Sequence, residues 1–114
     1  MEKHEVLLKW SKSEEENFEK KGENLATVWV IGPGGERIKD NNIKVQMFLS
    51  KDALIGLGTE LIRLAYNFRE GRHWHLEPMS KDNIVQTMGV YLTPDSEELI
   101  ICCDDLGILS DYRK

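Results

Sequence analysis

The sequence predicts an α+β fold, in which one long helix packs on a face of a mostly antiparallel sheet. One stretch, residues 49–71, has the apolar periodicity of a long helix. Short segments rich in β-branched and aromatic residues precede and follow it. The expected order is three strands, the helix and three more strands, which is typical of α+β domains. Whether the strands form one strongly bent sheet or two groups stays open.

Three strands are expected before the helix, over residues 5–10, 25–31 and 43–49. The last of these alternates apolar and polar side chains, as a half-buried strand does. The charged stretch 11–24 is either a solvated loop or a marginal helix. The run 32–35, Gly-Pro-Gly-Gly, lacks the phosphate-loop pattern and is expected to be a turn.

The helix itself is expected over about residues 51–69. Ser50 is a suitable N-cap, because its hydroxyl can accept a hydrogen bond from an amide of the first turn. Leu49 and Leu54 are spaced as a hydrophobic staple, and Gly71 can adopt the left-handed conformation of a C-cap. Residues at three- and four-residue steps are expected to form one buried stripe: Leu54, Leu57, Leu61, Leu64, Ala65 and Phe68.

Two glycines, Gly56 and Gly58, lie in the first half of this helix. Each costs about 1 kcal/mol relative to alanine in an exposed helix interior. The favoured interpretation is that they let a strand or the sheet come close to the helix. The alternative is that a ligand approaches the backbone there.

Three strands are expected after the helix, over residues 73–77, 86–92 and 98–103. The turn-forming run 93–96, Thr-Pro-Asp-Ser, separates the last two, which should therefore pair as a hairpin. The tail 104–114 retains enough apolar residues to dock weakly.

Composition indicates a single domain, residues 1–114, with 40% hydrophobic and 31% charged residues. Because no run has the length of a membrane helix or the apolar core of a signal peptide, a cytoplasmic protein without membrane contact is expected. The net charge of −5 argues against nucleic-acid binding. Cys102 and Cys103 are adjacent and should point to opposite faces of a strand, so we expect both to be reduced and at least one to be buried.

The C-terminal end is the acidic end of the chain. Its charge could steer a basic partner, and Tyr112 could act as an aromatic anchor. A simple solvated surface is the alternative. The candidate partner-binding residues are Asp95, Glu97, Glu98, Asp104, Asp105, Asp111 and Tyr112.

One motif has the residue types of a metal site. His73, His75 and Glu77 would share a face of a strand and suit zinc or ferrous iron. The favoured interpretation instead places Trp74 and Leu76 in the core and the histidines on a polar face. No metal or cofactor is therefore expected.

No catalytic signature is found. A thiol of Cys102 or Cys103 could act with a histidine only if the fold joined them, and the neighbouring acids would oppose thiolate formation. The adjacent acids at 97–98 and 104–105 diverge on an extended chain and suit surface charge better than acid–base chemistry. The chain is not expected to be an enzyme.

Residues 43–103 resemble small immunity proteins of bacterial polymorphic toxin systems, including those of contact-dependent growth inhibition. The resemblance lies in a strand leading into a Ser-x-x-Ala-Leu helix, a His-x-His-Leu-x-Pro strand and a Leu-Thr-Pro-x-Ser turn. The matching residues are Leu49, Ser50, Ala53 and Leu54, then His73, His75, Leu76 and Pro78, then Leu92, Thr93, Pro94, Ser96, Leu99 and Ile100. The resemblance implies an α+β fold and a toxin-neutralising function. It implies no catalysis, and it brings no set of functional residues to this chain.

The expected function is therefore to bind and neutralise a cognate toxin domain, such as a basic nuclease, through an acidic, aromatic-containing surface. The first alternative is a small metal-dependent enzyme or metal-binding module that uses His73, His75 and Glu77. The second is a subunit that dimerises through a sheet edge, which is compatible with either function.

Overall fold

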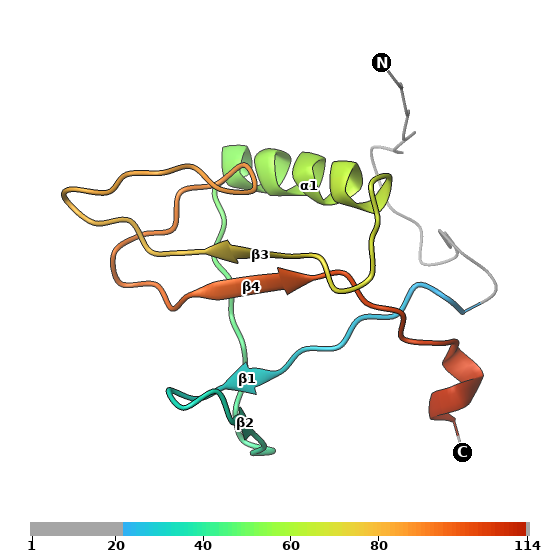
Figure 1. The fold of residues 1–114 in the computed structure, drawn as a ribbon. Coiled ribbons are helices and arrows are strands. Elements are labelled where there is room, and N and C mark those ends of the chain that lie inside the picture. Colours follow the sequence, from blue (N-terminus) through green and yellow to red (C-terminus); the bar gives the residue numbers. More distant parts are fainter. Residues whose placement is uncertain (1–21, 114) are drawn as a thin grey trace. The chain divides into compact units, whose positions relative to one another are not determined.

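The computed structural model describes residues 22–113, which contain one α-helix, four strands and a short 3₁₀ helix (Figure 1). The chain divides into two compact units, one formed by residues 30–105 and the other containing residues 22–29 and 106–113. The elements are β1 (Val30–Ile31), β2 (Arg37–Ile38), α1 (Lys51–Ala65), β3 (His73–Leu76), β4 (Leu99–Cys102) and the 3₁₀ helix Leu109–Tyr112.

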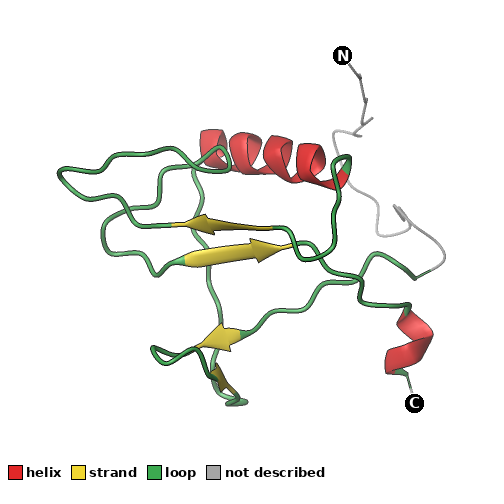
Figure 2. Cartoon of the chain, in the orientation of Figure 1, coloured by secondary structure: helices red, strands yellow, loops and turns green. Residues whose placement is uncertain are grey.

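The α+β class is confirmed, but the expected strand order is not. Within residues 22–113 the strands form two antiparallel sheets of two strands each, β1–β2 and β3–β4 (Figure 2). The strand expected over residues 5–10 lies outside the described residues.

Helix α1 begins as expected. The Ser50 side chain accepts a hydrogen bond from the Ala53 backbone N–H at 3.1 Å, while Ser50 itself keeps an extended backbone. Asp52 in the first turn and Arg63 in the last turn complement the helix dipole. The N-cap prediction is therefore confirmed.

The helix ends at Ala65, earlier than expected, because Asn67 replaces a helical hydrogen bond. Its side-chain amide donates to the Arg63 carbonyl at 2.9 Å, while its backbone N–H donates to the Leu64 carbonyl at 3.2 Å. The backbone amide thus takes the tighter three-residue bond that ends many helices. Gly71 adopts a left-handed φ of 85° but does not cap α1, since its N–H donates into the β3–β4 ladder.

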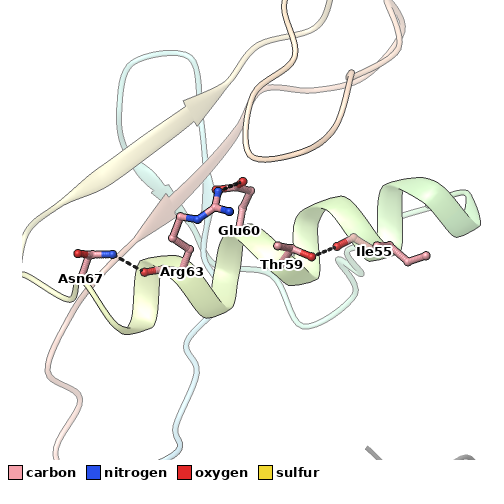
Figure 3. A network of polar contacts seen from close by, with 5 residues as sticks. All are labelled: Ile55, Thr59, Glu60, Arg63 and Asn67. Carbon is pink, nitrogen blue, oxygen red and sulfur yellow. Dashed lines mark hydrogen bonds and ion pairs between the residues drawn. The ribbon is translucent and has the colours of Figure 1, made fainter. Parts of the chain in front are cut away.

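Other polar contacts of α1 lie along its exposed side (Figure 3). The Thr59 hydroxyl donates to the Ile55 carbonyl at 2.7 Å, and Glu60 forms an ion pair with Arg63 one turn later. Such exposed pairs contribute little stability, about 0.5 kcal/mol. Along residues 22–113, no helix combines the length and the apolar character needed to cross a membrane.

The buried side of α1 is not the predicted stripe. Leu57 is buried and Ala53 and Leu64 are half-buried, whereas Leu54 and Leu61 are 59% and 40% exposed. The predicted stripe is therefore wrong in its rotation about the helix axis, although it shares Leu57 and Leu64 with the observed one. The predicted pairing of Leu54 with Leu49 as a staple is not supported, because Leu54 points away from the core.

The cause of this rotation is a close contact between Gly56 and Gly89. A Cβ atom added to either glycine would overlap the backbone of the other. Gly56 thus permits the close approach of another backbone segment, but that segment is a turn and not the expected strand or sheet. The expectation of close approach is wrong at Gly58, where an added Cβ would meet nothing within 4 Å.

Gly89 belongs to a tight two-residue turn. The backbone N–H of Thr87 donates to the Val90 carbonyl at 2.9 Å, and that of Val90 donates back at 3.1 Å. Both central residues have positive φ, 52° at Met88 and 77° at Gly89, as in the turns that suit hairpins. The predicted continuous strand over 86–92 is therefore wrong, since the chain reverses direction in its middle.

Strand β4 consequently pairs with β3, not with 86–92 as predicted. The register places His73 opposite Cys102 and Leu76 opposite Leu99. A further hydrogen bond, from the Cys103 N–H to the Arg72 carbonyl at 2.7 Å, continues the ladder beyond the strands.

The β1–β2 sheet is a short hairpin around the predicted turn. The Gly32 N–H donates to the Glu36 carbonyl at 2.7 Å, and Gly35 has a φ of 84°. The turn over 32–35 is confirmed, but only the last two residues of the strand predicted over 25–31 are a strand. The strand predicted over 43–49 is wrong, because this segment forms no ladder with any described strand.

The core joins α1, the β3–β4 sheet and the Thr87–Val90 turn. Its buried members are Leu57 from the helix, Leu76 from β3 and Val90 from the turn, with Leu76 only 1% exposed. Half-buried side chains complete this cluster: Leu49, Ala53, Met88, Leu92, Leu99 and Ile101. One face of the sheet therefore packs under the helix.

The Gly56–Gly89 contact makes a prediction about stability. The variant Gly56→Ala should lower the free energy of unfolding by about 1 to 3 kcal/mol, because the new methyl group overpacks a backbone contact. Its matched control is Gly58→Ala, which should raise the free energy of unfolding by about 0.5 to 1 kcal/mol because it removes a helix-interior glycine in open space. Urea unfolding followed by circular dichroism measures both. Equal effects of the two substitutions would contradict the close contact.

Candidate functional site

The predicted partner-binding residues are divided between the two units of the chain. Five of them lie in residues 30–105, around β4, and the other two, Asp111 and Tyr112, lie in the other unit. The five are Asp95, Glu97, Glu98, Asp104 and Asp105, and all are exposed.

Strand β4 has acidic residues at both ends. Alternation along the strand directs Leu99 and Ile101 toward the helix, where they pack on the core. It directs Glu98, Ile100, Cys102 and Asp104 to the opposite face, and we call these four residues the β4 stripe. All four are exposed, and Ile100 is 44% exposed. The sheet face away from α1 is thus apolar in its centre and acidic at both ends.

The two histidines of β3 lie on the same face as the β4 stripe. His75 is opposite Ile100, and its Nδ1 is hydrogen-bonded to Glu98 Oε1 at 2.6 Å. The His73 ring meets the His75 ring edge to face, with centroids 5.1 Å apart, and its Nδ1 donates to the Gly71 carbonyl at 3.1 Å. The histidines are exposed and lie on the face opposite Leu76, as predicted, but this face is mixed and not polar throughout, since it also carries Ile100 and Cys102.

The three residues of the metal-dependent alternative, His73, His75 and Glu77, do not form a metal site with one another. The acidic partner of His75 is Glu98 from the neighbouring strand, not Glu77. In the part of the chain that the structure describes, no group of three or more His, Cys, Asp or Glu side chains is placed to hold a metal ion. The geometry therefore gives the metal-dependent alternative no support.

Trp74 lies between the two histidines in β3 and on the other face of the sheet. It is 40% exposed, so its predicted place in the core is only partly correct, whereas Leu76 is fully buried. The Arg72 guanidinium covers the ring, 5.7 Å from its centroid, and donates to the Asn67 carbonyl at 3.2 Å. This cation is therefore held away from the β4 stripe.

The two cysteines behave as predicted. Both are free thiols, with Cys102 exposed and Cys103 only 6% exposed. Their side chains alternate across the sheet, which places Cys102 opposite His73. Ile100, Cys102 and the two histidines are the residues that charge counting alone did not include in the acidic surface.

Asp95 is part of a turn. The Thr93 hydroxyl donates to Asp95 Oδ1 at 2.7 Å, and the Ser96 backbone N–H donates to the Thr93 carbonyl at 3.0 Å, which confirms the predicted turn. The Thr93 hydrogen bond, followed by a backbone hydrogen bond, holds the pKa of Asp95 below its ordinary value of 3.8.

Asp111 and Tyr112 also make local contacts, within the 3₁₀ helix and its flanks. Asp111 Oδ2 accepts from the Ile108 backbone N–H at 3.1 Å, and the Tyr112 hydroxyl donates to the Leu106 carbonyl at 2.7 Å. The Leu109 N–H donates to the Gly22 carbonyl at 2.8 Å, which attaches the tail within its own unit. The Tyr112 side chain nevertheless stays 62% exposed.

The geometry describes an exposed surface with several acidic residues, and comparison with known families gives the class of the protein. The family model that matches residues 44–104 is one of immunity proteins of toxin systems, which confirms the resemblance seen in the sequence. The family is Immunity protein 32, and since the match spans more than half of the chain, the chain belongs to it. The comparisons with curated proteins and with solved structures found no match.

The turn at Asp95 makes a prediction about pH. In the native protein the Asp95 carboxyl should titrate below 3.8, and Thr93→Val should raise its pKa toward that value by removing the largest cause of the shift. Because the folded pKa is lowered, the stabilising contribution is present above the unfolded pKa and is lost as the pH falls through the folded pKa. Carboxyl-carbon NMR titration measures the shift.

The control for this titration is Thr93→Ser, which keeps the hydroxyl and should keep the pKa of Asp95 low. If the valine and serine variants titrated alike, the Thr93 hydroxyl would not be the main cause of the lowered pKa.

Proposed function

We propose that this protein is an immunity protein that binds and neutralises a cognate bacterial toxin domain. The observation that carries the proposal is the family match over residues 44–104, which includes α1, β3 and β4. Immunity protein families are generally non-enzymatic. Neutralisation by binding needs no catalytic group on this chain, and we propose that the protein has no activity of its own.

Charge supports a basic toxin, such as a nuclease domain. The chain has a net charge of −5, and the acidic residues around β4 are exposed. An acidic surface attracts a basic partner over a distance of about 8 Å at physiological salt and so raises the association rate. Fast association matters because the toxin has to be captured before it reaches its target.

We place this capture in the bacterial cytoplasm, within a polymorphic toxin or contact-dependent growth inhibition system. The toxin would then meet the immunity protein in the compartment where its targets lie. Asp95, Asp111 and Tyr112 stay candidate contacts, although their polar atoms already serve local hydrogen bonds. Strands β3 and β4 each pair with only the other among the described strands, so a dimer through an open sheet edge stays a further proposal.

Co-expression tests the proposed function. We expect the protein encoded immediately upstream to be toxic when expressed alone, and this chain to restore growth and co-elute with it in size exclusion. The negative control is Leu76→Asp, which places a charge at the most buried side chain and should abolish protection by unfolding the core. A harmless neighbour that forms no complex would overturn the proposal.

Salt dependence provides a second measurement on the same complex. Because the proposed attraction is electrostatic, raising the salt from 50 to 500 mM should slow association by roughly 10-fold or more, with a smaller effect on dissociation. Stopped-flow or surface-based kinetics separates the two rates.

A further inference from the structure

We propose that the toxin docks on the face of the β3–β4 sheet that α1 leaves open, along the β4 stripe. The matching toxin surface would carry an apolar centre between lysine or arginine side chains. This inference rests on the proposed function and narrows it, because it selects one face of one sheet from all the acidic positions of the chain.

The two faces of this sheet have different environments. On the helix side, Leu99 and Ile101 pack against the buried core. On the other side, Ile100 is 44% exposed and Cys102 is exposed, although both belong to the same strand. A strand that exposes apolar side chains next to histidine rings is a surface suited to burial by another protein.

The positions of the two acids indicate the charge pattern expected on the partner surface. Glu98 and Asp104 are six residues apart on an extended chain and therefore about 20 Å apart, since each residue advances the chain by about 3.3 Å. This length matches one side of an ordinary protein interface, in which an apolar centre is surrounded by a polar rim. A basic surface with the same spacing would be complementary in both charge and polarity.

Two side chains in or beside β3, Arg72 and His75, bear on this charge. Arg72 is held over Trp74 on the other face of the sheet and donates to the Asn67 carbonyl. His75 is hydrogen-bonded to Glu98, whereas the hydrogen bond described for Asp104 within residues 22–113 is the one that its Oδ1 accepts from the neighbouring Asp105 N–H. Both acidic ends of the β4 stripe are exposed, and Glu98 would meet a partner together with its histidine.

The exposed side of α1 is a less suitable candidate. It exposes Leu54 and Ile55, by 59% and 58%, but its charged side chains Glu60 and Arg63 pair with each other. That face has no net charge that would select a basic partner. The β4 stripe, in contrast, carries an acidic side chain at each end, Glu98 and Asp104.

The first test uses the unmodified protein and the toxin encoded immediately upstream. Iodoacetamide should alkylate Cys102 in the free protein and should react with it at least 10-fold more slowly in the complex. Cys103 is an internal reference, because it is buried in the free protein and should stay unreactive in the complex. Unchanged reactivity of Cys102 in a stable complex would overturn the inference, and protection that grows with the concentration of the free protein would instead indicate contact between copies of the chain.

The second test reverses charge with a matched control. Glu98→Lys combined with Asp104→Lys should weaken toxin binding by at least about 100-fold, because each lysine would face a basic side chain. The control is Glu70→Lys combined with Asp82→Lys, which changes the net charge equally at exposed acids outside the stripe. It should weaken binding by less than about 5-fold, through the loss of long-range attraction only.

A third variant, Ile100→Ser, tests the apolar centre and should weaken binding by about 10-fold. Circular dichroism and thermal unfolding confirm that each variant folds, and the alkylation test needs no substitution. If the wild type formed no complex, the proposed function itself would fail. If the wild type bound while the stripe variant and its control bound equally well, only the docking face would be wrong.

Discussion

The backbone contact between Gly56 and Gly89 is the constraint on which the unit formed by residues 30–105 depends. With no side chain on either residue, the Thr87–Val90 turn approaches the helix directly. This contact sets the rotation of α1, so that Leu57 meets Leu76 and Val90 while Leu54 stays exposed. The helix covers only one face of the β3–β4 sheet, and the orientation of that sheet decides which charged residues reach solvent together.

Local features of the fold could be predicted from the sequence, and contacts between distant residues could not. The Ser50 cap and the turns at 32–35 and 93–96 depend on neighbours within a few residues, so composition indicates them. The rotation of α1 and the pairing of β3 with β4 depend on partners far along the chain. The alternating pattern of 86–92 suggested a strand because it carries no sign that Met88 adopts a positive φ.

The candidate site likewise combines features that could be predicted from the sequence with contacts that could not. Counting charges identified the acidic end of the chain, but it could not separate residues around β4 from Asp111 and Tyr112, which belong to the other unit. His75 and Glu98 are 23 residues apart and come together only through the antiparallel register. A histidine and an acid at outward positions of two paired strands would have indicated this contact. The sequence can show that signal only when the correct partner strand is known.

The Gly56–Gly89 contact also differs from its neighbours in how far apart along the chain its two partners are. Helix α1 and the Thr87–Val90 turn are each closed by short-range hydrogen bonds, so each can form before the rest of the unit. Their docking closes a long loop that includes β3, so this contact has a cost in chain entropy that the local contacts do not have. Because both contact points lack side chains, this contact depends on the alignment of two backbones and not on the burial of apolar side chains.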